Sequence, residues 1–518
     1  MNIRAPAISG LGERLRAQRG VTMALGLGLI ALGLLFQNEV TAAIAVWIDS
    51  TAYNHCFLVI PIVAYLVWDR RETFSIASAR PLPLATLAAV PLALAWLVAE
   101  RLGVMEGRQL VAMSFVELLF FTILGPALWW RLAGPLLYLY FLVPFGAFLT
   151  PMLQDFTADF VRHGLTVLHI PAYIDGYLIE IPEGAFLIAE ACAGLRFLIA
   201  ATAFGCLYAL LMYRSPVRRA VFIVASLIVP IIANGFRALG IVALGHYLGS
   251  AQAVEADHVL YGWIFFSIVI LVLIALGLPF REDHRPLVME RPSIPPTTGH
   301  MRATLIGVAA LIVLAGIGPA IAIQLDRVPL PGFPAELATL VPGRGCSVQP
   351  TPLTEGLGSP GRVIVQRVRC ADGIVELTIE VFSPRTTASR LIAEQRRLTL
   401  LPGAEDVQSH PLQIAHAPAR TWRMVETPNP FHLVATSLWV EGKPTQGGLG
   451  MRLRQALNSI VGSRFFPVLV VVTPEADPLG DGSNRAGQAE RNITTFLQSQ
   501  ADLTNQIARL TGSDSGRP

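Results

Sequence analysis

The sequence predicts a mainly α-helical, polytopic membrane protein with about nine transmembrane helices, followed by a soluble α+β domain outside the membrane. Of the 518 residues, 53% are hydrophobic and only 14% are charged, a charged share well below that of ordinary soluble domains. The mean hydropathy of +0.55 agrees with this class. A change of pattern near residue 325 predicts the soluble domain.

The N-terminal segment is basic and precedes the apolar run VTMALGLGLIALGLLF. A cleaved signal peptide has the same pattern. The many later apolar runs favour a first transmembrane helix instead. We therefore expect residues 1–20 to be a cytoplasmic segment and residues 21–285 to form the membrane domain.

Further apolar runs have the length of roughly 17–25 residues that a hydrocarbon core of about 30 Å requires. They lie near residues 53–68, 82–99, 109–130, 134–150, 185–212, 219–247, 259–279 and 303–324.

The arginines indicate the orientation of these spans, because cytoplasmic connections carry an excess of positive charge. Most of them fall in alternate connections: Arg70, Arg71, Arg80, Arg131, Arg214, Arg218, Arg219, Arg281, Arg285, Arg291 and Arg302. Arg101, Arg108 and Arg162 are the exceptions. The pattern predicts a multi-pass protein of the inner (cytoplasmic) membrane with a cytoplasmic N-terminus. Residues 286–324 would be a cytoplasmic linker and the last transmembrane helix.

The connection from Thr150 to Gly184 is long and lies outside in this topology. Apolar residues recur at helical spacing in its first part: Leu153, Phe156, Phe160, Leu165 and Leu168. This helix either lies along the membrane surface or packs over the bundle. The following YLIEIPEG alternates like a short strand.

Residues 325–518 are expected to form a periplasmic α+β accessory domain, long enough for its own core. Period-two patterns predict strands in RVIVQRVRC, IVELTIEVF and FHLVATSLWV. Helical patterns occur near 386–399, 448–462 and 485–511.

The cysteines and basic residues argue against a metal site and against nucleic-acid binding. None of the five cysteines forms a CxxC pair, so we expect no metal and no cofactor. The basic residues are scattered and the net charge is only +3, which gives nucleic-acid binding little support. Cys346 and Cys370 lie outside the membrane in this topology, which favours a disulfide over two free thiols.

Three residues converge on the outer membrane face in this topology. Cys192 lies about seven residues, or roughly 10 Å, into one span, and Arg237 lies about 27 Å above the inner end of the next. His258 begins the span after that. A cysteine in an apolar helix is usually a packing residue, as we expect for Cys206. An arginine within a span is costly unless it is paired or hydrated, so a functional role is the default for Arg237.

Together these residues resemble a nucleophile, a general acid/base and an electrostatic stabiliser. Arg237 can stabilise both a Cys192 thiolate and the oxyanion formed by its attack on a carbonyl. His258 can accept the thiol proton and deliver it to the leaving amine. Supporting candidates nearby are Arg196, Asn234, His246 and Asp257. Asn234 and Gly235 either loosen their helix or serve its packing.

The motifs CAGLR, NGFRALG and DHVLYGW resemble those of the exosortase/archaeosortase family, and most closely the exosortase A type. The resemblance covers roughly residues 20–285. It implies a membrane cysteine protease or transpeptidase in which Cys192, Arg237 and His258 are the catalytic residues. The family commonly has serine after the cysteine, where this chain has Ala193. Some exosortase A proteins carry a fused exosortase-associated domain at the position of residues 325–518.

The resemblance also implies the partners. These are membrane-anchored proteins with C-terminal sorting signals of the PEP-CTERM type, an unknown acyl acceptor and membrane lipid, with no nucleic acid. Cleavage would pass through a thioester and would serve exopolysaccharide-linked cell-surface sorting. The alternative is a non-enzymatic component of exopolysaccharide assembly or export, in which Arg237 and His258 bind an anionic lipid-linked sugar. A transporter ranks last, because the polar residues lie in one layer rather than through the depth of the spans.

Overall fold

The chain divides into two compact units by its internal contacts. The membrane unit consists of Met1–Leu92 and Arg108–Gly316, and the C-terminal unit consists of Ala93–Gly107 and Ile317–Pro518. The computed structural model describes residues 9–71, 79–249, 258–282, 300–327, 345–349, 362–401, 407–415, 417, 421–428, 431–445, 447–463, 465–475, 485–500 and 503–510.

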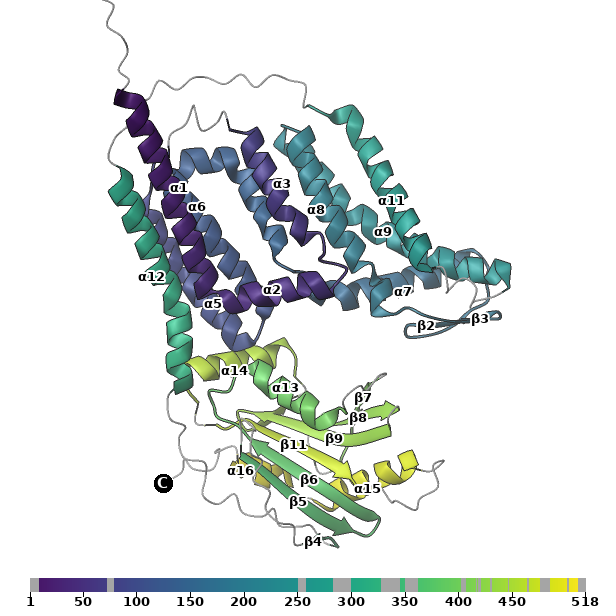
Figure 1. The fold of residues 1–518 in the computed structure, drawn as a ribbon. Coiled ribbons are helices and arrows are strands. Elements are labelled where there is room, and N and C mark those ends of the chain that lie inside the picture. Colours follow the sequence, from purple (N-terminus) through teal and green to yellow (C-terminus); the bar gives the residue numbers. More distant parts are fainter. Residues whose placement is uncertain are drawn as a thin grey trace, which may run out of the picture. The chain divides into compact units, whose positions relative to one another are not determined.

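Six helical runs in the described ranges are long and apolar enough to cross a membrane (Figure 1). They are η1 (Pro83–Ala88) with α5 (Ala89–Leu102), α6 (Met105–Leu137) with η2 (Tyr138–Leu142), α8 (Leu195–Met212), α9 (Pro216–Leu248), α11 (His258–Gly277) with η5 (Leu278–Phe280), and α12 (His300–Arg327). A seventh span arises if the bent pair α1 (Ser9–Leu35) and α2 (Gln37–Asp49) is one crossing. The chain is a multi-pass membrane protein, and the predicted number of nine spans is not confirmed.

The differences from the expected spans have local causes. The expected spans 109–130 and 134–150 fall largely on the single run Met105–Leu142, which bends at Gly125 (φ 74°). The backbone N–H of Arg80 donates to the carbonyl of Leu124 there, so the break does not leave that carbonyl unsatisfied. The expected span 53–68 is the shorter helix α3 (Cys56–Asp69).

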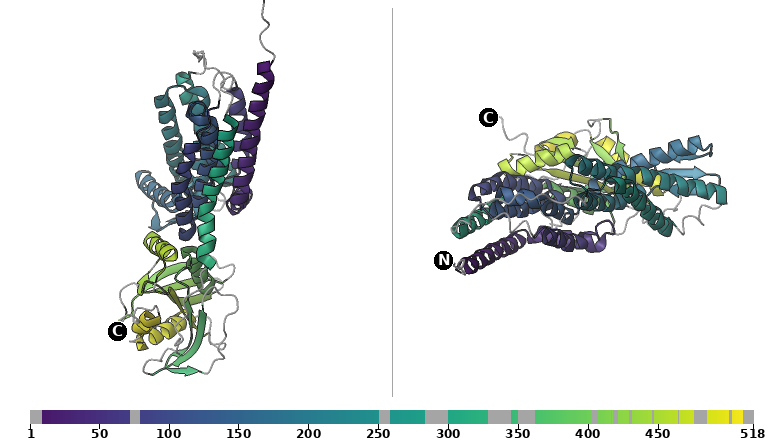
Figure 2. Two further views of the ribbon diagram at one scale, coloured as in Figure 1. Left: turned by 90° about the vertical axis from the view of Figure 1, so that its left-hand side faces the viewer. Right: turned by 90° about the horizontal axis from the view of Figure 1, so that it is seen from above.

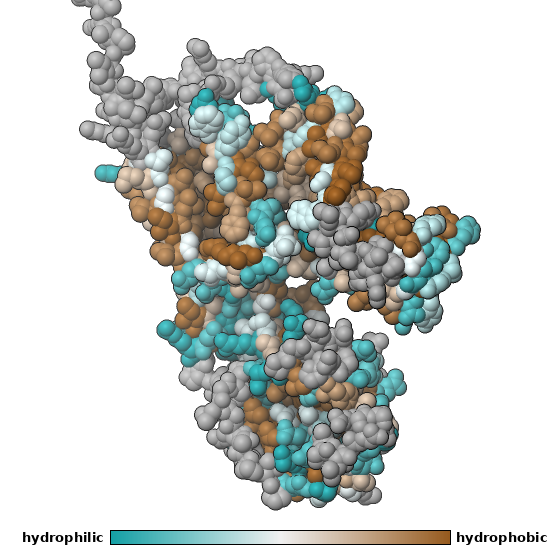
Figure 3. Space-filling view, turned by 45° about the vertical axis from the view of Figure 1, so that its right-hand side comes forward, coloured by the Kyte–Doolittle hydropathy of each residue, from teal (hydrophilic) through white to brown (hydrophobic). Residues whose placement is uncertain are grey.

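Figure 3 shows a mostly apolar surface over the membrane helices that face the viewer, as contact with lipid requires. On α11 the exposed side chains include Trp263, Ile264, Ile268, Leu271, Val272 and Leu276. Such a continuous exposed apolar surface is typical of a membrane-facing helix.

The three arginines that deviate from the orientation pattern are all ion-paired. Arg101, which is fully buried, bonds Asp326 at 2.9 Å. The other two pairs are Arg108 with Glu39 at 2.6 Å and Arg162 with Asp159 at 2.7 Å. Each exception therefore has a carboxylate partner that offsets its charge.

The arginine-rich connection between α8 and α9 meets the one that follows α11 at one end of these helices. Glu282, after η5, accepts hydrogen bonds from the backbone N–H groups of Arg214 and Ser215 and pairs with Arg218 at 3.4 Å. Since α8 has 18 residues, its other end lies about 27 Å away. That other end holds the candidate site.

Helix α7 (Thr150–Val167) lies across the direction of α8 (Figures 1 and 2). One face packs inward through Leu153 and Leu165, whereas Phe156 and Leu168 are exposed. The helix therefore packs over the bundle on one side, as one of the two predictions stated. It is preceded by η3 (Ala147–Leu149) and followed by the small antiparallel sheet β1 (Tyr173–Asp175), β2 (Leu178–Ile181) and β3 (Gly184–Leu187).

The C-terminal unit is built on an antiparallel sheet with the order β4-β5-β6-β11-β9-β8-β7, and β10 pairs with β9. The strands are β4 (Ser347–Gln349), β5 (Arg362–Cys370), β6 (Gly373–Val381), β7 (Gln408–Leu412), β8 (Trp422–Pro428), β9 (Phe431–Val440), β10 (Lys443–Thr445) and β11 (Val468–Pro474). The predicted strands correspond to β5, β6 and β9. The predicted α+β composition is confirmed.

Helices cover both faces of this sheet (Figure 1). Val470 of β11 packs with Phe496 in the core formed with α15 (Arg485–Ser499) and α16 (Leu503–Leu510). Its neighbour Leu469 packs with Leu391 and Met451 in the core formed with α13 (Ala388–Thr399) and α14 (Leu449–Val461). The period-two alternation of the strand separates the two cores.

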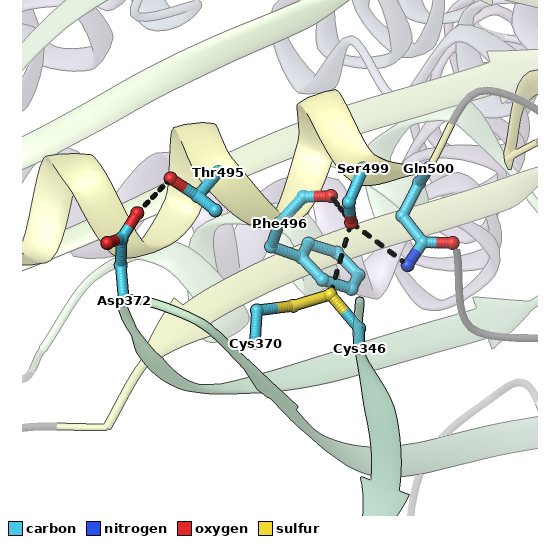
Figure 4. The surroundings of a disulfide bond; sticks show 7 residues. All are labelled: Cys346, Cys370, Asp372, Thr495, Phe496, Ser499 and Gln500. Atoms are coloured by element: carbon cyan, nitrogen blue, oxygen red, sulfur yellow. Dashed lines mark hydrogen bonds between the residues drawn. A yellow bond between two sulfur atoms is a disulfide. The ribbon is translucent and has the colours of Figure 1, made fainter. Parts of the chain in front are cut away.

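The disulfide expected between Cys346 and Cys370 is present (Figure 4). It connects the residue before β4 to the end of β5. The Sγ of Cys346 lies 3.2 Å from the Oγ of Ser499 on α15, and Thr495 of the same helix donates a hydrogen bond to Asp372. The disulfide thus joins the sheet edge beneath α15.

Replacing Cys346 and Cys370 together by Ser should lower the free energy of unfolding of the C-terminal unit by about 3 kcal/mol, because the bridge closes a short loop in the unfolded chain. Thermal unfolding of the purified full chain measures this. Cys206→Ser, which removes a free thiol, is the control. An unchanged midpoint in the double variant would contradict a structural role for the bridge.

Candidate active site

Cys192 lies on the short 3-10 turn η4 (Glu190–Ala193), between β3 and α8. The expected position of Cys192, about two turns inside a transmembrane helix, is wrong. Residues 185–212 begin with a strand and a turn, and the helix starts only at Leu195. The thiol is free and half-buried, at the end of α8 opposite the arginine-rich connection.

Gly194 separates the cysteine turn from α8. Its φ of +80° is in the left-handed region, which glycine adopts without steric cost. A Cβ at this position would also lie 2.5 Å from the Cγ of Asn234. The CAGLR motif therefore has glycine for two reasons, the backbone conformation and the close approach of Asn234.

Asn234 of α9 fixes the position of the cysteine turn. Its Nδ2 donates to the carbonyl oxygen of Cys192 at 2.8 Å and to the Oγ1 of Thr157 on α7 at 3.2 Å. The residue is almost fully buried, so both bonds are shielded from water. Gln154, one turn earlier on α7, donates to the carbonyl of Ile188 at 2.6 Å. Helices α7 and α9 therefore hold the segment that carries the nucleophile candidate.

Helix α9 continues without a break through Asn234 and Gly235. Gly235 lies against the ring of Phe160, where a Cβ would approach to 2.7 Å. Of the two predicted roles, packing is the one that the structure supports. The asparagine serves a hydrogen-bond network and the glycine serves a close helix contact.

Arg237 lies one turn after Asn234 on α9 and is only 2% exposed. Its Nε and Nη1 have no hydrogen-bond partner among the described residues. Its guanidinium carbon lies 5.3 Å from the centre of the Phe197 ring. A buried cation with open N–H groups is strongly unfavourable unless an anionic group approaches it. This is the arrangement expected of a site for an anion or a developing oxyanion.

Helix α11 packs beside Arg237. A Cβ at Gly262 would lie 3.1 Å from the Nη1 of Arg237, and Phe266 stacks on Phe197 at 4.5 Å. His258 is the first residue of α11. Residues four apart share a helix face, so position 258 lies one turn from Gly262 on the face toward Arg237. Asp257 lies outside the described residues.

Arg196 is close to the same group of residues. Its guanidinium carbon lies 4.8 Å from the centre of the Phe197 ring, which the guanidinium of Arg237 also approaches. The sequence argument that Arg196 shares a helix face with Cys192 does not hold, because Gly194 interrupts the helix between them. The structure places Arg196 nearby through the start of α8 instead.

His246 lies twelve residues beyond Asn234 on α9, about 18 Å along the helix. Its Nδ1 lies 2.8 Å from a carboxylate oxygen of Glu183, in the turn between β2 and β3. This hydrogen bond holds the pKa of Glu183 below its ordinary value. The structure therefore places His246 with the small sheet rather than beside Cys192.

A groove of about 550 Å³ lies between α7 and α9. Its lining is mostly apolar: Phe156, Asp159, Phe160, His163, Gly164, Val167 and Leu168 from α7 and its end, and Phe236 and Leu239 from α9. The rings of Phe160 and Phe236 meet at 4.9 Å. Such a groove suits an apolar segment rather than a polar metabolite.

The sequence reasoning missed Thr157, Gln154, Phe197 and Gly262. The position of Gly262 four residues after His258 was visible in DHVLYGW and could have indicated a close helix contact. Nothing local marks Thr157 or Gln154. Among the residues that the structure describes, no group of three or more His, Cys, Asp or Glu side chains could hold a metal ion.

Taken together, a free thiol, a buried arginine with open donors and the first turn of α11 lie around Phe197 and Asn234. Residues 47–275 match the family described as transmembrane exosortase (Exosortase_EpsH). The comparisons with curated proteins and with solved structures give no match.

Gly194→Ala and Gly249→Ala provide a matched pair. Both glycines have φ near +70° to +80°, but nothing lies within 4 Å of a Cβ at Gly249. The left-handed conformation alone should cost about 1–2 kcal/mol at either position. Gly194→Ala should cost more, because it also displaces Asn234, and it should change the rate at which Cys192 reacts with a maleimide. Equal thermal stability and equal thiol reactivity in the two variants would contradict the proposed contact.

Proposed function

Because the matched region of this chain belongs to the transmembrane exosortase family, we propose that the protein is a membrane cysteine protease or transpeptidase. Its substrates would be exported proteins with C-terminal sorting signals of the PEP-CTERM type. The buried Arg237 carries this proposal, because its Nε and Nη1 have no hydrogen-bond partner among the described residues. It lies on α9, the helix whose Asn234 also bonds the Cys192 turn.

In the proposed reaction the Cys192 thiolate attacks the scissile carbonyl. A C–S bond forms, and the carbonyl oxygen takes the negative charge. Arg237 stabilises this oxyanion from a site that excludes water, where such interactions are strongest. When the tetrahedral intermediate collapses, the C–N bond breaks and a thioester remains on Cys192.

His258 would accept the thiol proton and transfer it to the leaving amine. Its position one turn from Gly262, which lies against Arg237, supports this role. An acceptor nucleophile, or water, then attacks the thioester and releases Cys192. Asn234 does not touch the reacting atoms in this scheme. It is a positioning residue that holds the cysteine turn.

The apolar groove between α7 and α9 supports a membrane-anchored substrate. Phe236 and Leu239 line it in the half of α9 that lies toward the end away from the arginine-rich connection. By the positive-inside rule that end is the outer face of the inner membrane. A substrate whose apolar helix ends there would present its cleavage site at the depth of Cys192.

Cys192→Ser should reduce processing of a substrate with such a sorting signal by roughly 10³-fold or more. A serine hydroxyl has a much higher pKa than a cysteine thiol, so it is a weak nucleophile in a site that is built to use a thiolate. Gel mobility of a co-expressed tagged substrate measures this. Cys206→Ser is the matched control, since Cys206 lies on α8 in an apolar cluster with Val59 and Tyr138.

If Cys192→Ser processed the substrate at the rate of the unaltered chain, the peptidase proposal would be wrong. The alternative of a non-enzymatic component of exopolysaccharide assembly would then be favoured, with Arg237 binding an anionic sugar-lipid group.

Arg237→Gln should lower processing by about 10²–10³-fold, the usual effect of losing one group that stabilises an oxyanion. Arg237→Lys should recover little of this, because an ammonium cannot reproduce the planar donors of a guanidinium. Arg196→Gln is the control with a neighbouring, less buried arginine. A loss in the Arg196 variant as large as in the Arg237 variant would assign the electrostatic role to the pair rather than to Arg237.

A further inference from the structure

Helix α14 carries an uncovered row of apolar side chains. Leu449, Leu453, Leu457 and Val461 follow one another at intervals of four residues, and their exposed fractions are 68%, 44%, 61% and 80%. Residues at this spacing lie along one side of a helix. Single exposed apolar residues are common on soluble domains, but a continuous row along 13 residues indicates a partner.

The opposite side of α14 is firmly attached to the sheet and to the segment before α13. Met451 and Gln455 are buried there. The Nε2 of Gln455 donates to the carbonyls of Pro384 and Thr386 at 3.1 and 2.7 Å. Arg385 donates to the carbonyl of Ser459 at 3.3 Å, near the end of α14. The helix therefore cannot rotate to hide the apolar row without breaking these contacts.

The segment that holds α14 also contacts the end of a transmembrane helix. Ser389, in the first turn of α13, lies directly against Gly103, which follows α5 and leaves no room for a Cβ. Two residues earlier, Arg101 joins the ends of α5 and α12 by bonding Asp326 and the carbonyl of Ala322, both at 2.9 Å. All these residues belong to the C-terminal unit. Within this unit, α13 and α14 therefore lie at the level where two membrane helices end.

Helices α13 and α14 are also basic. Their arginines are Arg390, Arg396, Arg397, Arg452 and Arg454. The acidic residue in these two helices is Glu394, and it pairs with Arg397 at 2.5 Å. Arginines beside an apolar row are typical of helices that lie in the headgroup region of a membrane containing acidic phospholipids.

We propose that α14 is a membrane-docking helix. Its apolar row inserts at the boundary between headgroups and acyl chains, on the membrane face where α5 and α12 end. The arginines of α13 and α14 contact the phosphates of acidic phospholipids. The location at the ends of two spans favours lipid over a second protein as the partner. This role does not depend on the proposed catalytic activity.

The effect of docking is to fix the orientation of the sheet relative to the membrane surface. An interfacial helix about 20 Å long, anchored through Gln455 and Arg385, adds a lipid contact to the connection through α12.

Spin-label accessibility in the full chain tests the proposal. The background variant has Cys56, Cys192 and Cys206 replaced by Ala, which retains the disulfide, and a nitroxide is attached at Leu457→Cys. The matched control carries the label at Gln498→Cys, an exposed position on α15 at the other face of the sheet. Both proteins are placed in nanodiscs containing phosphatidylglycerol, and collisions with oxygen and with a water-soluble nickel chelate are compared.

The proposal predicts that the label at position 457 collides more with oxygen and less with the nickel chelate than the label at position 498. Equal accessibility at the two positions would overturn it. Dipolar broadening at position 457 that disappears on dilution with unlabelled protein would also overturn it, because it would assign the apolar row to a second copy. The intact disulfide and an unchanged elution volume verify that each labelled protein is folded.

Discussion

The hydrogen bonds of Asn234 determine the geometry of the candidate site. One amide group reaches the carbonyl of Cys192 and the hydroxyl of Thr157, and it does so through the space that glycine leaves at position 194. A 3-10 turn has few internal hydrogen bonds to fix it. The position of the thiol relative to α9 depends on this buried amide, together with the hydrogen bond of Gln154 on α7 to the carbonyl of Ile188.

The charge of Arg237 is offset differently from the charges of the ion-paired arginines. At the arginine-rich end, Glu282 ties the start of α9 to the end of α11. Arg101, Arg108 and Arg162 each have a carboxylate partner. Arg237 differs, because it is buried with Nε and Nη1 unsatisfied among the described residues. In the proposed reaction these buried donors would form a preorganised electrostatic site, and their unfavourable desolvation would be offset when an oxyanion forms.

Two sets of contacts within the C-terminal unit each hold an element against the sheet. The disulfide secures the edge of the sheet beneath α15, and the Gln455 and Arg385 contacts secure α14 on the other face. Each fixes an element that the sheet alone would hold weakly. The proposed contact of α14 with lipid would in turn hold this helix at the membrane surface.

Hydropathy and arginine placement determined the membrane class, the distribution of the site residues to one end of the helices and the α+β nature of residues 325–518, because these depend on local composition and period. The strands β5, β6 and β9 were found in the same way. The sequence also singled out Cys192, Arg237 and Asn234. Only the tertiary structure decided that Cys192 lies on a turn outside α8, since a left-handed Gly194 does not alter hydropathy. It also decided that His246 pairs with Glu183 and that Thr157 and Phe197 complete the site, because these contacts join elements far apart in the chain.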